Sequence, residues 1–219
     1  MSFLKIYKIL LNFFGKQNWW PAETKFEVIV GAILTQQTSW RNVEKAINNL
    51  KAHQLLNPLS LKEVELRQLE KLIKPSGFYR VKAKRLKEFV KFLFEKYDGN
   101  LENFLNLNKD ILRKELLSIK GIGKETADSI ILYAANKLTF VVDAYTIRIF
   151  NRLGLIKEEE YEAVKEIFEK SLPKDLELFK EYHALIVELG KNVCKKKPKC
   201  MECPLNDICD YALNNFGKK

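Results

Sequence analysis

The sequence predicts an all-α fold, and three observations support this. Apolar residues recur at intervals of three and four over most of the 219-residue chain, which is the spacing of amphipathic helices. Strand-like alternation is confined to residues 138–142, and five residues cannot support a sheet. Apolar residues make up 47% of the chain, enough for a packed core in one large domain or two small ones.

The expected helices follow one another through the whole chain. The N-terminal segment lacks the small-residue cleavage pattern of a signal peptide and is expected to be an ordinary first helix. Thr24 with Glu27, and Ser60 with Glu63, form capping-box patterns. From Ala83 to Tyr97 one helix face is apolar, and basic residues cover the rest. These basic residues are Arg80, Lys82, Lys84, Arg85, Lys87 and Lys91. Further helices are expected at about residues 43–55, 109–118, 125–136, 144–153, 160–171 and 176–191.

The charge balance favours a polyanionic partner. The chain has 38 Lys and Arg against 28 Asp and Glu, and the basic residues are spread along the sequence rather than gathered in a tail. A solvated lysine-rich surface is the alternative explanation. No apolar run approaches the roughly 20 residues needed to span a bilayer. We therefore expect no membrane partner and a cytoplasmic protein.

A tight turn is expected between a helix that ends near Ile119 and one that begins near Lys124. Glycine accepts positive φ and has no Cβ, so backbone N–H groups of the turn and of the next helix can approach a phosphate closely. Two glycines at this spacing also occur where helices meet only for packing. The flanking Leu-x-x-Ile-Lys and Lys-Glu-Thr-Ala-Asp-Ser-Ile-Ile favour a helix-hairpin-helix that binds DNA. Its expected DNA contacts are Gly121, Ile122, Gly123, Lys124, Glu125 and Thr126.

All the cysteines lie within sixteen residues near the C-terminus: Cys194, Cys200, Cys203 and Cys209. Disulfides are disfavoured in a chain with a core of its own and no secretory signal. Zinc usually binds two separated Cys-x2-Cys pairs, whereas this segment has one such pair flanked by longer spacings. Four thiolates on one compact loop favour a [4Fe–4S] cluster, with zinc as the alternative. The loop would also direct Lys195, Lys196, Lys197 and Lys199 toward a phosphate backbone, unless these lysines only solvate it.

Three segments together resemble the endonuclease III (HhH-GPD) superfamily of DNA glycosylases. They are the hairpin LLSIKGIGKETADSIILYA, the following FVVDAYTIRIFNRLG and the four-cysteine loop. The resemblance extends from about residue 24 to residue 210, and the first cysteine spacing is one residue shorter than is usual in the family. NWWPAETKFEVIVGAILTQQTSW and IKPSGFYRVKAKRL are similar to the 3-methyladenine glycosylase branch, some members of which lack the cysteines.

The resemblance implies two helical lobes that flank a DNA-binding cleft. One lobe is expected to be a six-helix barrel over residues 24–137 that contains the hairpin. The other is expected to combine residues 1–23 with residues 138–219 and to carry the cluster loop. Trp19-Trp20-Pro21 and Asp143 would then lie in the cleft, where the chain passes between the lobes.

Asp143 is the expected catalytic residue. Its local sequence, VVDAYTI, is also that of an ordinary N-cap at the start of a helix. The resemblance implies catalysis, because the essential aspartate of the family follows the hairpin by about twenty residues and Asp143 matches that position. Its carboxylate would stabilise the oxocarbenium-like sugar formed when the base of a flipped nucleotide leaves, and would orient the attacking water.

Glu125 bears on the type of reaction. In bifunctional members of the family, a lysine two residues after the second hairpin glycine forms a Schiff base that leads to strand cleavage. Here that position holds Glu125, which cannot form an imine, and the Cβ of Lys124 points in another direction on the helix. We therefore expect a monofunctional glycosylase. An acid in the first turn of a helix is also favoured by the helix dipole, and both statements can hold.

The expected base-binding residues include all three tryptophans, which fall within the first 40 residues. Core packing is the alternative role for such residues. The 3-methyladenine branch places an aromatic ring at the position of Trp40, opposite the position of Trp19, so the resemblance implies two rings that grip a base, a cationic base most strongly. The expected substrate contacts are Trp19, Trp20, Pro21, Trp40, Gln37 and Phe78. Gln37 would fill the gap left by the flipped nucleotide and Phe78 would wedge the opposite strand, unless both serve packing.

The expected function is the release of an alkylated purine such as 3-methyladenine from double-stranded DNA by a monomeric enzyme, without strand cleavage. Two alternatives stay open. One is an endonuclease III-type glycosylase and AP lyase that acts on oxidised pyrimidines, and the other is a non-catalytic iron–sulfur protein that binds DNA. His53 and His183 show no pattern of converging ligands and receive no role.

Overall fold

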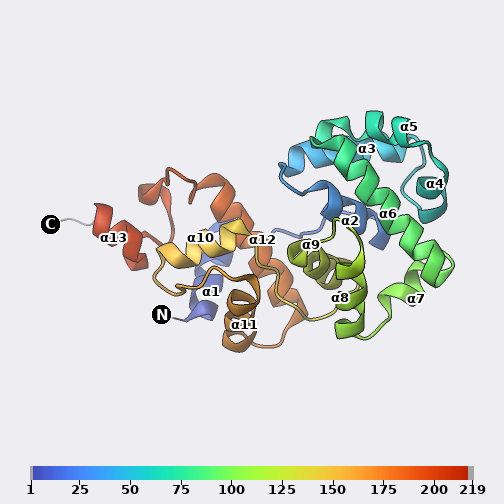
Figure 1. Ribbon diagram of the computed structural model, residues 1–219. Helices are drawn as coiled ribbons and strands as arrows, with labels where there is room; N and C mark the ends of the chain where they lie inside the picture. Colours follow the sequence, from blue (N-terminus) through green and yellow to red (C-terminus); the bar gives the residue numbers. More distant parts are fainter. Residues whose placement is uncertain (1, 217–219) are drawn as a thin grey trace. The chain divides into compact units, whose positions relative to one another are not determined.

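The computed structural model describes residues 2–216, and the regular elements in this range are all helical, which confirms the all-α prediction (Figure 1). The chain forms two compact units. One unit, called the hairpin unit below, comprises residues 20–137. The other, called the terminal unit, comprises the residues up to Trp19 together with those from Leu138 onward. Within the described range, no helix is long and apolar enough to cross a membrane.

The hairpin unit is built around helix α2. Its elements are α2 (Lys25–Leu34), α3 (Trp40–Ala52), α4 (Pro58–Glu63), α5 (Leu66–Leu72), η1 (Lys74–Ser76), α6 (Tyr79–Tyr97), α7 (Leu101–Leu105), α8 (Lys109–Ser118), α9 (Lys124–Ser129) and the π-helical turn η2 (Ile130–Ala134). Every residue from Phe26 to Leu34 is buried, and α2 packs against α3, α6, α9 and η2. Apart from Glu27, which pairs with Lys51 on α3, this run is apolar on all sides, and such a helix is stable only when it is surrounded in this way.

The terminal unit brings the first helix against helices more than a hundred residues later in the chain. Its elements are α1 (Phe3–Phe14), α10 (Ala144–Arg152), α11 (Tyr161–Ser171), α12 (Leu176–Asn192), η3 (Cys200–Glu202), η4 (Asn206–Ile208) and α13 (Asp210–Phe216). The ring of Phe3 stacks on Phe150 with centroids 5.1 Å apart and meets Phe168 edge-on at 4.8 Å. The hydroxyl of Tyr182 donates to the carbonyl of Phe3 at 2.8 Å. These aromatic contacts fix α1 against α10, α11 and α12.

One predicted helix start is wrong. Helix α4 begins at Pro58, and the side chain of Asn57 caps it by accepting a hydrogen bond from the backbone N–H of Ser60 at 2.8 Å. Ser60 therefore lies inside the helix, and Glu63 is its last residue rather than the third. An asparagine cap followed by proline at the first helical position is a stronger start signal than the serine–glutamate pair. Thr24 caps α2, as predicted.

Helix α6 has a smaller basic face than predicted. Lys82 is only 1% exposed, and its ammonium group donates to two backbone carbonyls. The ammonium group of Lys87 donates to the carbonyls of Leu61, Lys62 and Val64 at the end of α4. These two lysines therefore join segments of the hairpin unit instead of facing solvent.

Candidate active site, DNA-binding hairpin and cluster loop

Asp143 is the N-cap of α10, as its local sequence predicts. Its Oδ1 accepts hydrogen bonds from the backbone N–H of Thr146 at 2.7 Å and from the Thr146 hydroxyl at 2.8 Å. The same hydroxyl oxygen lies 3.4 Å from the backbone N–H of Asp143, which completes a capping box. The carboxylate is therefore held in one orientation, with its side chain 10% exposed.

The second carboxylate oxygen of Asp143 faces His183, a residue that received no role from the sequence. His183 lies on α12, and its Nε2 is 3.8 Å from Asp143 Oδ2. Burial lowers the pKa of His183 below its usual 6.5, and the nearby carboxylate opposes that effect. A neutral imidazole therefore stands beside the carboxylate at neutral pH. No sequence signal indicates this pairing, because the two residues belong to different helices 40 positions apart.

The two helices of the hairpin are joined by a buried ion pair. Arg113 on α8 donates to both carboxylate oxygens of Asp128 on α9, at 2.9 and 3.1 Å, and the Asp128 side chain is completely buried. Such a two-pronged contact fixes direction as well as distance. The helices end and begin at Ser118 and Lys124, close to the predicted bounds.

The two glycines of the turn have different roles. Gly121 has a φ of +93°, and a Cβ there would come within 2.4 Å of the Arg85 side chain. Gly123 has a φ of −93°, so the expected need for positive φ applies to Gly121 alone. Nothing lies within 4 Å of the place that a Cβ on Gly123 would occupy. Gly123 is the N-cap of α9, so this open space adjoins the start of the helix.

Gln36 connects the hairpin to the segment after α2. Its amide nitrogen donates to the carbonyl of Gly121 at 3.1 Å and to the hydroxyl of Thr126 at 2.9 Å. Its amide oxygen accepts a hydrogen bond from the Arg85 guanidinium group on α6. One side chain thus ties together three segments that are far apart in the sequence. The neighbouring Gln37 is exposed.

Trp20 and Trp40 meet within the hairpin unit. Their ring centroids are 5.5 Å apart at an interplanar angle of 89°, so the two rings contact edge to face. Tyr133 on η2 completes the group, 5.4 Å from Trp20. π-Helical turns frequently accompany functional sites, and this one replaces the end of the helix predicted over residues 125–136. A Cβ on Gly31 would approach the Trp20 indole to 3.1 Å, so the absence of a side chain there makes room for the ring.

The other predicted substrate contacts lie on the surface or near it. Pro21 and Phe78 are exposed, and Phe78 is 65% exposed despite being aromatic. Trp19 is half-buried and belongs to the terminal unit, as does Asp143.

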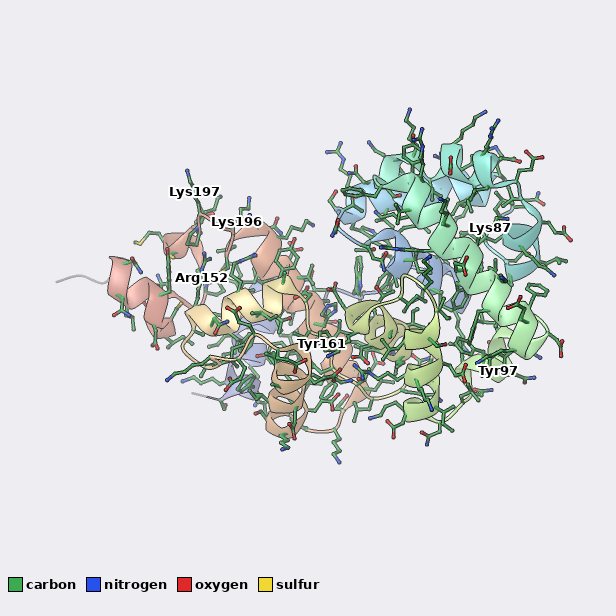
Figure 2. All side chains as sticks on the ribbon, viewed as in Figure 1. Lys87, Tyr97, Arg152, Tyr161, Lys196 and Lys197 are labelled. Carbon is green, nitrogen blue, oxygen red and sulfur yellow. The ribbon has the colours of Figure 1, made fainter. Side chains whose placement is uncertain are left out.

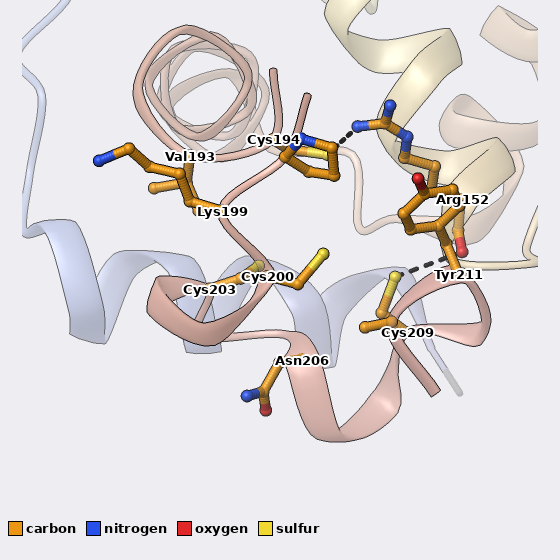
Figure 3. A pocket seen from close by; sticks show the side chains of 11 residues that line it. Arg152, Val193, Cys194, Lys199, Cys200, Cys203, Asn206, Cys209 and Tyr211 are labelled. Atoms are coloured by element: carbon orange, nitrogen blue, oxygen red, sulfur yellow. Dashed lines mark hydrogen bonds between the residues drawn. The ribbon is translucent and has the colours of Figure 1, made fainter. Parts of the chain in front are cut away.

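The four cysteines line a single small pocket (Figure 3). All four are free thiols. Among residues 2–216 no three His, Cys, Asp or Glu side chains converge on one point as ligands of a single metal ion. The sulfur-bearing side chains of all four cysteines line the one pocket.

Two arginines of α10 hold this loop. Arg152 donates from Nη1 to the sulfur of Cys194 at 3.2 Å, and from the same guanidinium group to the carbonyls of Lys195 and Lys196 at 2.6 and 3.0 Å. Arg148 donates to the carbonyl of Cys194 at 3.0 Å. Because Asp143 caps the N-terminus of α10, one short helix connects the candidate catalytic residue to the cysteine loop.

The donor set of the pocket fits a bound cluster, because four cysteine thiolates are the usual ligands of a [4Fe–4S] group. Burial raises the pKa of Cys203 to about 11 and also raises the pKa of Cys200, so these thiols stay protonated unless a cationic group is present. Iron supplies such a charge and binds the thiolate form. Lys196 and Lys197 project from the loop into solvent (Figure 2), and Lys195 is exposed as well.

Comparison with known proteins agrees with this geometry. Residues 30–174 match the HhH-GPD superfamily of base excision DNA repair proteins, and residues 195–209 match the iron–sulfur binding domain of endonuclease III. A Methanocaldococcus jannaschii protein named "Putative DNA repair glycosylase" is 61% identical over 208 residues, which are 94% of each chain.

Two solved structures are similar over nearly the whole chain. A 3-methyladenine DNA glycosylase of H. pylori bound to 1,N6-ethenoadenine is 32% identical with a TM-score of 0.79, covering 87% of this chain and 98% of that one. A non-covalent complex of endonuclease III with DNA is 25% identical with a TM-score of 0.83, covering 98% of this chain and 97% of that one. The helical fold, the hairpin and the cysteine loop agree with these comparisons. The chain therefore belongs to the HhH-GPD superfamily of base excision DNA repair proteins and is a DNA glycosylase with an endonuclease III-type [4Fe–4S] cluster.

Proposed function

We propose that this glycosylase releases an alkylated purine such as 3-methyladenine from double-stranded DNA by hydrolysis and leaves the strand intact. The observation that carries the proposal is Glu125, which occupies the place where strand-cleaving relatives have a lysine. A carboxylate cannot attack C1′ to form an imine, so water must complete the reaction. The likeness to the H. pylori 3-methyladenine glycosylase supports the choice of substrate.

Asp143 is the proposed catalytic residue. As the N-glycosidic bond breaks, positive charge develops on the sugar, and a carboxylate held in a water-poor site stabilises that charge strongly. The two donors of Thr146 orient Oδ1 before the substrate arrives, so little reorganisation is needed during the reaction. The same carboxylate would orient the attacking water.

The tryptophans are the proposed base-binding residues. Trp40 would grip the base together with Trp19, and Trp20, which contacts Trp40 edge to face, would support the Trp40 ring. Pro21 would complete the base contacts. A cationic purine gains from an aromatic face through cation–π attraction of about 1–2 kcal/mol, which a neutral base lacks.

The proposed DNA contacts come from three places. The open space beside Gly123 lets the first backbone N–H groups of α9, from Lys124 to Thr126, approach a phosphate, with Gly121 and Ile122 forming the turn. The exposed Gln37 would enter the gap left by the flipped nucleotide, and the exposed Phe78 would wedge the opposite strand. Lys195, Lys196 and Lys197 would add phosphate contacts from the cluster loop, which the [4Fe–4S] group holds in shape when bound.

We infer a monomeric enzyme that works at the nucleoid.

Endonuclease III-type chemistry is the second candidate, because the chain has the iron–sulfur domain of endonuclease III and superposes well on its DNA complex. One experiment separates the two. The protein is incubated with methylated DNA and with DNA that carries oxidised pyrimidines, the free bases are identified, and a parallel sample is treated with borohydride. We expect free 3-methyladenine and little covalent trapping. Release of oxidised pyrimidines with high-yield trapping would establish the second candidate instead.

A further inference from the structure

Two exposed residues of the hairpin unit have an unusual backbone conformation. Gln37, three residues after the end of α2, has a φ of +55°, and Phe78, directly before α6, has a φ of +46°. The left-handed region is unfavourable for any residue with a Cβ and persists where the surrounding structure imposes it. Both residues are proposed above to enter the DNA duplex.

Lys82 ties the two segments that carry these residues. Its ammonium group donates to the carbonyl of Leu34, the last residue of α2, at 2.8 Å, and to the carbonyl of Ser76, the last residue of η1, at 2.6 Å. Carbonyls at the end of a helix have no partner inside the helix. One buried ammonium group therefore satisfies both ends, three residues before Gln37 and two residues before Phe78.

Stability alone does not account for a lysine at this place. Lys82 is 1% exposed, and burial, with a smaller effect of the Arg85 charge, lowers its pKa to about 8. Burial in the folded state therefore disfavours the charged form of Lys82. Buried charged groups can often be replaced by apolar residues of similar volume without loss of stability. The distinctive property of Lys82 is that it binds two loop ends at once.

We propose that Lys82 is a positioning residue for duplex opening, which joins the end of α2 to the turn before α6 and so sets the spacing between Gln37 and Phe78. This inference rests on the proposed function, in which both side chains occupy the duplex while the damaged nucleotide is flipped out. The spacing between Gln37 and Phe78 matters because the two side chains must contact opposite DNA strands at the same opened base-pair step. A nucleotide that is already unpaired and unstacked needs no such pair of residues.

The test compares one lesion in two settings. Single-turnover excision of a site-specific alkylated purine is measured in a fully paired duplex and in the single strand. We expect Lys82→Met to slow excision from the duplex by about tenfold or more, since small misplacements of positioning groups have effects of that size. Excision from the single strand should change by less than about twofold, because the lesion is already exposed there.

Lys87→Met is the matched control. Lys87 lies on the same helix (Figure 2) and also donates to backbone carbonyls, but at the end of α4. Its loss should leave the ratio of the two excision rates unchanged. An unchanged ratio for Lys82→Met, whether both rates fall together or neither falls, would overturn the positioning role.

Gln37→Ala and Phe78→Ala separate this inference from the function on which it rests. If neither variant loses activity specifically on the duplex, the proposed insertion itself fails. If they do lose it and Lys82→Met does not, only the role of Lys82 fails. Circular dichroism verifies the fold of each variant. If Lys82→Met does not fold, Lys82→Gln replaces it in the same comparison of duplex and single strand. Glutamine keeps an N–H donor on a shorter side chain. A slower rate on the duplex alone would again support the positioning role, and an unchanged ratio would overturn it.

Discussion

Removing the buried charge of Lys82 should change how the stability of the protein depends on pH. Burial lowers the pKa of Lys82 from 10.5 to about 8 in the folded state. Between these two values the unfolded chain binds more protons than the folded chain, so the free energy of unfolding rises with pH. At about 1.36 kcal/mol for each pH unit, the wild-type protein should gain roughly 3 kcal/mol over this interval. Lys82→Met lacks the titrating group and should not show this gain.

The assay is thermal unfolding followed by circular dichroism for the wild type and Lys82→Met at several pH values from about 7.5 to 10.5. For a chain of this size, 1 kcal/mol corresponds to about 2–4 °C in the midpoint, so the midpoint difference between wild type and variant should grow by roughly 10 °C. Comparing the two proteins at each pH removes the contribution of groups that they share. Lys84→Met, which removes an exposed lysine from α6, is the control.

A midpoint difference that stays constant over this interval would refute the reasoning. It would mean that the Lys82 ammonium group is as well solvated in the folded protein as in the unfolded chain. A difference that begins to shrink only near pH 10.5 would mean that the two carbonyl hydrogen bonds outweigh burial and raise the pKa of Lys82 above 10.5 instead.

Four further predictions concern the site and the loop. Asp143→Asn should slow base release by at least about 100-fold, which is the usual effect of losing one electrostatic contact to a transition state. Its DNA affinity, measured by fluorescence anisotropy, should persist, and loss of base release and DNA affinity together would indicate a binding role for Asp143. Glu125→Lys should create borohydride-trapped protein–DNA complexes, and their absence on gels would show that a lysine at this position cannot reach the sugar. Burial lowers the pKa of His183, so this residue should not affect the free energy of unfolding above about pH 6.5. Below about pH 6.5 the free energy of unfolding should fall by up to about 1.4 kcal/mol per pH unit, until the pH reaches the folded-state pKa of His183. Urea denaturation of His183→Gln should lack this dependence on pH, and equal slopes for variant and wild type would contradict the lowered pKa. Arg152→Met, which removes the hydrogen bond to the sulfur of Cys194, should speed the loss of visible cluster absorbance in the presence of a chelator; an unchanged rate would show that the contact does not protect the cluster.

The sequence was sufficient for features that depend on nearby residues. The helix predicted over residues 109–118 has those bounds as α8, and the helix predicted to start near Lys124 starts there. Helix formation follows from apolar spacing and from caps a few residues away, and both can be read along the chain. Competition between local signals caused the error at Ser60, where Asn57 provides the better cap.

The cysteine loop was also predictable, because the four thiols that make the cluster site are close in sequence. Comparison with the endonuclease III iron–sulfur domain confirmed the [4Fe–4S] prediction over zinc. The catalytic role of Asp143 and the DNA contacts of the hairpin stay predictions, because they concern a complex with DNA.

Tertiary structure alone decided which groups become neighbours. Lys82 has the sequence context of a surface lysine and is buried, because the carbonyl ends of α2 and η1 converge on it. His183 had no recognisable partner and faces Asp143, because α10 and α12 pack together. A polar side chain takes its protonation state and its hydrogen-bond partners from the groups that surround it in space. Local spacing determines the helices, whereas the surroundings of each polar group depend on how distant helices pack.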